Sequence, residues 1–262
     1  MRTVFPRCFS VSLAIVSLAV VWAQPPASAE VEGLRLFAQG HYREAAPLLA
    51  AASAAAPGRP ELARALGLSY LKLQDVEGAR GAFARLFGVP PASATARLLS
   101  AKMMMGEQLE EMAEPELRAA VKLSPKLPEA HFMLGELAIF RGDTDAGIAD
   151  LLEEISLNPA FALAYYRLGD AFTRKDMWEQ AVPPLEKAIW LNPDFSSPYI
   201  LLGKAYFHTG RLEFAEGMLK RAIRMDPNNT GAHYLLASVY RDLGRLEDSR
   251  KELDVWRNLS KK

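Results

Sequence analysis

Apolar and small side chains recur along the chain at a spacing of 34 residues. The segments SLNPAFALAYYRLGDAF at 156–172 and WLNPDFSSPYILLGKAY at 190–206 align without a gap. Prolines keep the same spacing with no insertion or deletion, at Pro57, Pro91, Pro125, Pro159, Pro193 and Pro227. A period of this length is typical of stacked helix–turn–helix units, so the pattern predicts an array of copies.

Within each unit the apolar positions follow a helical period. We number the units 1–34 from residues 26, 60, 94, 128, 162, 196 and 230, which places the proline at position 32. Positions 8 and 20 are always glycine, alanine or serine, and position 24 is leucine in six units and phenylalanine in one. Positions 20, 24 and 27 predict an apolar stripe on the second helix of each unit. The small residues allow the two helices to approach closely.

This pattern resembles the tetratricopeptide repeat family over residues 30–262. The resemblance implies an all-α solenoid of seven 34-residue helix–turn–helix repeats wound into a right-handed superhelix. Unit 3 departs most, with Ser100 at position 7, no glycine at position 8, and three methionines in a row at 103–105. We expect it to be the least stable unit. Arg257 replaces the apolar residue found at position 28 of units 2–6, which predicts a polar outer face on the last helix.

The N-terminus has the features of a secretory signal. Arg2 and Arg7 precede an apolar run at 9–23, and Ala27-Ser28-Ala29 provides a small-residue cleavage site. A retained membrane anchor is the alternative, but the run is shorter than the roughly 20 residues that a bilayer span needs. We therefore predict a cleavable signal peptide at 1–29, a solenoid at 30–262, and export. The family resemblance favours the periplasm, with secretion as the alternative.

Charge and motifs argue against several classes of protein. The chain has 31 basic and 31 acidic residues, and cleavage after Ala29 would leave 29 against 31, a net charge of −2. A nucleic-acid binder would show a basic excess or a basic stripe, and neither is present in the sequence. Cleavage would also remove Cys8, the one cysteine, so disulfides and cysteine ligands are not expected.

The sequence also lacks the familiar catalytic signatures. It has no G-x-S-x-G, no H-E-x-x-H and no glycine-rich phosphate loop, so we predict neither catalytic residues nor a cofactor. His131 and His233 share position 4 and are interpreted as packing residues. His208 and His233 lack a third ligand, so no metal site is predicted.

The family resemblance implies that positions 2, 5, 9, 12 and 13 of the first helices line a concave groove. Together, positions 5, 9 and 12 predict an apolar strip with polar flanks that binds a protein or peptide. For any single residue, packing between helices is an equally weighted alternative. The residues assigned to the groove are Phe132, Tyr166, Ile200 and Tyr234 at position 5, Glu136, Asp170 and Lys204 at position 9, and Ile139 and Phe207 at position 12.

These features favour an exported, non-enzymatic adaptor that holds an extended or helical segment of an envelope or secreted partner. Two other classes remain open at this point. One is a self-assembling structural envelope protein, a homo-oligomer that pairs through unit 1 or unit 3. The other is an envelope enzyme or glycan-binding protein, including an assembly factor for pilus, secretion or outer-membrane machinery.

Overall fold

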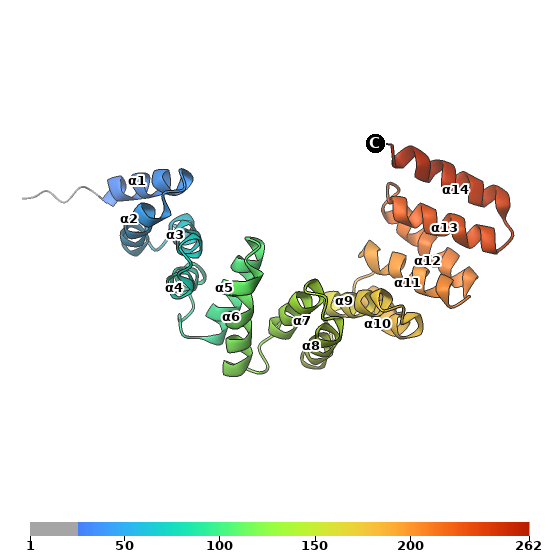
Figure 1. The fold of residues 1–262 in the computed structure, drawn as a ribbon, viewed down its shortest axis with the longest axis horizontal. Coiled ribbons are helices and arrows are strands. Elements are labelled where there is room, and N and C mark those ends of the chain that lie inside the picture. The colour runs from blue at the N-terminus through green and yellow to red at the C-terminus, as the bar shows by residue number, and fades with distance from the viewer. Residues whose placement is uncertain (1–25, 262) are drawn as a thin grey trace, which may run out of the picture.

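The protein is an array of paired helices in the computed structural model, which describes residues 26–261. Over that range it has fourteen α-helices and no strand, and consecutive helices form seven hairpins (Figure 1). The predicted all-α solenoid is therefore confirmed. The helices are α1 (Pro26–Ala38), α2 (Tyr42–Ala55), α3 (Pro60–Lys72), α4 (Val76–Phe87), α5 (Ala94–Gly106), α6 (Glu110–Leu123), α7 (Ala130–Phe140), α8 (Thr144–Leu157), α9 (Ala162–Arg174), α10 (Trp178–Leu191), α11 (Ser196–His208), α12 (Leu212–Met225), α13 (Thr230–Asp242) and α14 (Leu246–Leu259).

The predicted signal peptide falls almost entirely outside the described residues. Helix α1 begins at Pro26, so the predicted cleavage point after Ala29 lies in its first turn. Signal cleavage stays a prediction. No helix between residues 26 and 261 combines the length and the apolar character that a bilayer crossing requires.

Small residues bring the two helices of each hairpin together, as the sequence pattern predicted. A Cβ atom added to Gly67 would lie 2.3 Å from the Phe83 ring, and one added to Gly169 would lie 2.5 Å from Leu185. In unit 4 a Cβ on Gly135 would lie 3.0 Å from the backbone oxygen of Gly147. The large residue at position 24 therefore fills the space that the missing side chain leaves, and the hairpins pack as rigid pairs.

In every hairpin the residue at position 15 of the turn has a left-handed backbone conformation. Glycine fills it in four units, at Gly40, Gly142, Gly210 and Gly244, where φ lies between 74° and 87°. Gln74, Gln108 and Asp176 take the same conformation in the other three, with φ of 60°, 59° and 56°. The first helix therefore ends at the same position of the period whether or not glycine is present, because packing of the hairpin compensates for the steric cost.

The apolar stripe predicted at position 27 is interrupted in unit 4 by Glu154, a fully buried carboxylate. Its Oε1 accepts a hydrogen bond from the backbone N–H of Glu129 at 2.9 Å, and its Oε2 accepts one from the N–H of Phe132 at 3.3 Å. Glu129 has φ of 68°, and its own side chain bonds none of the free N–H groups that open α7. Glu154, from α8, therefore supplies the cap of α7 across the hairpin.

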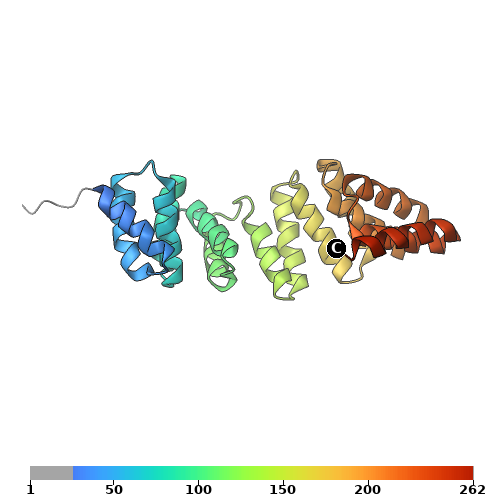
Figure 2. The same ribbon diagram turned by 90° about the horizontal axis from the view of Figure 1, so that it is seen from above.

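Unit 3 forms both of its helices but is joined to its neighbours differently from the other units. Six-residue connections, 88–93 and 124–129, flank it, whereas the other hairpins are joined by four residues. They arise because α4 ends early at the left-handed Gly88 and α7 starts late after Glu129. The first helices of most neighbouring units touch, but α5 barely touches α3 or α7 (Figures 1 and 2).

A buried ion cluster holds unit 3 to unit 2. The Oε1 atom of Glu116 on α6 accepts hydrogen bonds from Arg80 of α4 at 2.9 Å and from Arg97 of α5 at 2.8 Å. On the other side, Lys102 Nζ lies 2.6 Å from Glu129 Oε2 in the connection before α7. These polar contacts add to an apolar core that runs without a break from unit 2 through unit 3 to unit 5.

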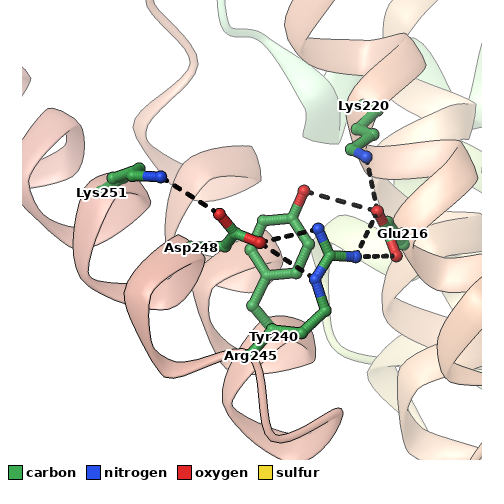
Figure 3. Close-up of polar contacts among 6 residues, drawn as sticks. All are labelled: Glu216, Lys220, Tyr240, Arg245, Asp248 and Lys251. Carbon is green, nitrogen blue, oxygen red and sulfur yellow. Dashed lines mark hydrogen bonds and ion pairs between the residues drawn. The ribbon is translucent and has the colours of Figure 1, made fainter.

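The last hairpin is fastened to unit 6 by a second polar cluster, shown in Figure 3. Arg245 Nη1 lies 3.0 Å from both carboxylate oxygens of Glu216, its Nη2 lies 2.8 Å from Asp248, and its guanidinium covers the Tyr240 ring at 4.3 Å. Unit 6 repeats the arrangement, with Arg211 over Tyr206 at 4.8 Å and 2.6 Å from Glu179. Helix α14 leaves Leu246 and Val255 exposed among its charged residues, and Ser249 is its one buried residue.

Candidate functional site

The first helices of units 3, 4 and 5 enclose a surface pocket of about 280 Å³. Three residues assigned to the groove from the sequence, Glu136, Ile139 and Asp170, line this pocket. Met105 at the end of α5 and Leu137 of α7 complete its apolar floor together with Phe140. Charged side chains form the remainder of the lining, at Glu110, Arg167 and Arg174.

Phe140 is the most exposed large apolar side chain in the described part of the protein, at 74%. It ends α7 at position 13, one of the positions that the family resemblance places in the groove. Phe140 was not among the predicted groove residues, which were assigned at positions 5, 9 and 12. An exposed ring beside an apolar pocket is a feature of interaction sites rather than of a self-contained core.

The charged rim of the pocket is mostly paired within the protein. Arg167 Nε lies 2.6 Å from Glu136 Oε1, and Arg174 Nε donates to Asp170 Oδ2 at 3.0 Å. These pairs link α7 to α9 and one turn of α9 to the next. Glu110, the first residue of α6, has no ionic partner among the described residues. The rim therefore carries three carboxylates against two guanidinium groups.

The aromatic strip predicted at position 5 is not a continuous open surface. Phe132 is 6% exposed, and its ring packs against Phe161 at a centroid distance of 5.0 Å. Tyr166 packs in the same way against Phe195, at 4.8 Å. Both phenylalanines occupy position 34, directly before the next first helix. Position 5 therefore joins successive units, and the assignment of Phe132 as an exposed groove residue is wrong.

The other two residues at position 5 also differ from the expectation of one shared strip. Ile200 is half-buried and packs on a core cluster that contains Tyr199, Ala222 and Ala232. Tyr234 is 50% exposed, and its ring lies 5.5 Å from Trp256. Neither residue lines the pocket beside Phe140.

Lys204 and Phe207 belong to a separate cluster on α11. The rings of His208 and Trp178 stack at 4.0 Å and 9°, Phe207 meets His208 edge-on at 5.4 Å, and Lys204 Nζ lies 5.2 Å from the Trp178 centroid. Burial and then the charge of Lys204 lower the pKa of His208, which favours the neutral ring in the stack. Because Trp178 is already covered by His208, this cluster offers little free aromatic face.

Two other histidines, His131 and His233, have structural partners. His131 Nδ1 lies 3.0 Å from Asp150, and His233 bonds Glu252 at 2.6 Å and the backbone oxygen of Pro227 at 3.0 Å. In both cases position 4 of the first helix is tied to position 23 of the second. Within residues 26–261, no three His, Cys, Asp or Glu side chains are grouped closely enough to hold a metal ion.

Comparisons with family models match most of the described chain. One tetratricopeptide repeat model matches residues 31–103 and 132–197, a second matches 214–260, and a third matches 196–229. The first model alone covers more than half of the sequence. A search among curated proteins found no match.

Several solved structures share the fold at low sequence identity. YrrB, described as a TPR protein with an unusual peptide-binding site, is 18% identical with a TM-score of 0.62, over 69% of this chain and 93% of that one. MamA from Desulfovibrio magneticus RS-1 is 20% identical with a TM-score of 0.60, over 64% and 95%. Pseudomonas aeruginosa PilF is 18% identical with a TM-score of 0.60, over 76% and 91%.

Proposed function

The chain belongs to the tetratricopeptide repeat family, and from this premise we propose that it is a non-catalytic scaffold that binds a segment of another protein between α5, α7 and α9. The observation that carries the proposal is the pocket beside Phe140, where an exposed ring adjoins an apolar floor and a charged rim. Such a surface suits an apolar anchor from a partner, with the rim setting orientation. The peptide-binding site named for YrrB supports a role of the same kind.

The cellular setting that we propose is the envelope, with the periplasm favoured over secretion. The N-terminal sequence supports this setting, through its two arginines, its apolar run and the Ala27-Ser28-Ala29 site. Cell fractionation with an antibody to the chain tests it. Recovery of the full-length chain in the cytoplasm would contradict both export and signal cleavage.

Site-specific photo-crosslinking tests the scaffold role. A photoreactive phenylalanine analogue replaces Phe140 in one variant and Trp190, which is 72% exposed on α10, in the control. The two positions are equally accessible, so random collisions crosslink both. We expect a discrete adduct from position 140 only, identifiable by mass spectrometry of the joined peptide.

A second variant tests whether the adduct depends on the pocket. Met105→Ala removes part of the apolar floor without changing the crosslinking residue, and circular dichroism checks that the helices remain. We expect the adduct to weaken severalfold. Equal adducts from positions 140 and 190, or one unaffected by Met105→Ala, would count against a groove between α5, α7 and α9.

A further inference from the structure

The pocket beside Phe140 and a second cavity share one lining residue, Glu110. The second cavity, of about 610 Å³, lies between units 2 and 3, and its charged lining residues are Glu110 and Glu111 alone. Its other lining residues are neutral, at Gln74, Val76, Gln108, Leu109 and Met112. A partner segment bound beside Phe140 that continues past Glu110 would therefore leave the apolar pocket and meet the carboxylates of Glu110 and Glu111.

In the linings of the two cavities the arginines have ionic partners, but two of the glutamates do not. Arg167 and Arg174 are each held by an acidic residue of the rim, so neither offers a free cation to a ligand. Glu110 and Glu111 have no ionic partner among the described residues. Across the linings of both cavities four carboxylates face two guanidinium groups, a net charge of −2. An acidic ligand would meet repulsion here, whereas a basic one would find two unpaired carboxylates.

The apolar pocket suits a side chain rather than a helix. Its volume of about 280 Å³ corresponds to roughly nine water molecules at about 30 Å³ each. That space accepts one or two large side chains, which would cover Phe140 and contact Met105 and Ile139. A whole helix would have to lie outside the pocket and insert only its anchor.

We infer that the partner segment carries a large apolar side chain followed closely by lysine or arginine, the apolar residue filling the pocket at Phe140 and the basic residue pairing with Glu110 and Glu111. This inference rests on the proposed scaffold function and specifies the chemistry of its ligand. The apolar contact supplies affinity, and the carboxylates supply direction along the groove.

Selection from a random peptide library on the immobilised full chain tests the inference. We expect enriched peptides to share an aromatic or aliphatic residue with Lys or Arg within a few positions. A selected peptide is then measured by fluorescence anisotropy. Phe140→Ala should weaken its binding about tenfold or more, and Glu110→Gln/Glu111→Gln should weaken it about three- to tenfold and reduce its dependence on salt.

Matched variants separate local from general effects. Glu213→Gln/Glu247→Gln makes the same charge change in the first turns of α12 and α14, and Trp190→Ala removes an exposed ring from α10. Neither should alter binding. Peptides that need Phe140 but are indifferent to the Glu110/Glu111 change would overturn the inference and leave the scaffold function standing. Enriched peptides rich in Asp and Glu would do the same, and a library with no enriched peptide would count against both.

Discussion

At the scale of single residues, glycine at position 8 is required by contact and not by backbone conformation. Gly67 lies in the middle of α3, and a methyl group there would overlap the buried ring of Phe83. Gly217 on α12 is equally helical, but nothing lies within 4 Å of its added Cβ. Substitutions at Gly67 test the steric role of glycine, whereas substitutions at Gly217 test its effect on helix propensity alone.

Opposite outcomes are therefore expected from the same substitution at these two positions. Gly67→Ala should lower the free energy of unfolding by about 1–3 kcal/mol through overpacking. Gly217→Ala should raise it by about 0.5–1 kcal/mol, because alanine restricts the unfolded chain and favours the helix. Urea denaturation followed by circular dichroism measures both. Stabilisation by Gly67→Ala would mean that α3 and α4 do not approach as closely as described.

Tyr206 makes stability depend on pH in the alkaline range. Burial, and then the hydrogen bond that its hydroxyl donates to Glu186 at 2.5 Å, raise the pKa of Tyr206 to about 12. Unfolded tyrosine loses its proton near pH 10. Between pH 10 and 12 the folded protein therefore holds a proton that the unfolded chain has lost, so stability falls as pH rises.

Tyr206→Phe should remove the part of this alkaline slope that Tyr206 contributes. At neutral pH the variant should lose about 1 kcal/mol with the hydrogen bond to Glu186. The difference in stability between wild type and variant should then shrink from pH 10 to pH 12. Denaturation midpoints across that range measure it, and parallel curves would show that Tyr206 is not responsible.

At the scale of helices and hairpins, the buried cap supplied by Glu154 is the most consequential departure from the repeat. Alanine fills the same position in units 1, 3, 5 and 6, so the hairpin geometry itself has no need of a long side chain there. The need comes from α7, whose opening N–H groups have no local cap because Glu129 is left-handed.

Glu154→Ala should destabilise the protein by roughly 2–3 kcal/mol, because the buried N–H of Phe132 and the partly buried N–H of Glu129 lose their acceptor and a cavity remains. Hydrogen exchange should accelerate at the first amides of α7, including that of Phe132. Glu153→Ala changes an exposed neighbour on the same helix and should stay within about 0.5 kcal/mol of wild type. Unchanged exchange in α7 would exclude the capping role.

The helices could be predicted from the sequence because their packing repeats. Small residues at positions 8 and 20 and a large apolar residue at 24, leucine or phenylalanine, make the same contact in every unit, so the sequence period reports the packing. The groove could not be predicted as well, because its surface depends on the connections. Phe132 is covered by Phe161, a residue outside the first helices, and the pocket at Phe140 requires the wide spacing around unit 3.

At the scale of the whole molecule, units 2 and 3 are joined by a shared apolar core and by the ion cluster around Glu116. Its carboxylate is 7% exposed and serves two arginines, one from each unit. Removing the carboxylate leaves Arg97 without a counter-charge and Arg80 with only the exposed Glu77, 3.8 Å away. Nearest-neighbour contacts determine cooperativity in arrays of this kind, so a weak junction separates their unfolding.

Glu116→Ala should cost about 3 kcal/mol and divide thermal unfolding into two transitions, one on each side of the junction. Glu77→Ala removes the other carboxylate near Arg80, but Glu77 is 91% exposed and the change should cost less than about 0.5 kcal/mol. Scanning calorimetry distinguishes one transition from two. A single, merely shifted transition for Glu116→Ala would show that the apolar contacts alone couple these units.

Because of the six-residue connections on either side of unit 3, we expect the array to bend more easily at unit 3 than elsewhere. Elsewhere, first helix presses on first helix, and bending must compress side chains that are already in contact. At unit 3 the first helices barely touch, so we expect bending to be concentrated there. The two cavities that share Glu110 lie beside unit 3. A small rotation at unit 3 would become a large displacement at α1 and α14, and a segment bound at unit 3 would then set the distance between the two ends.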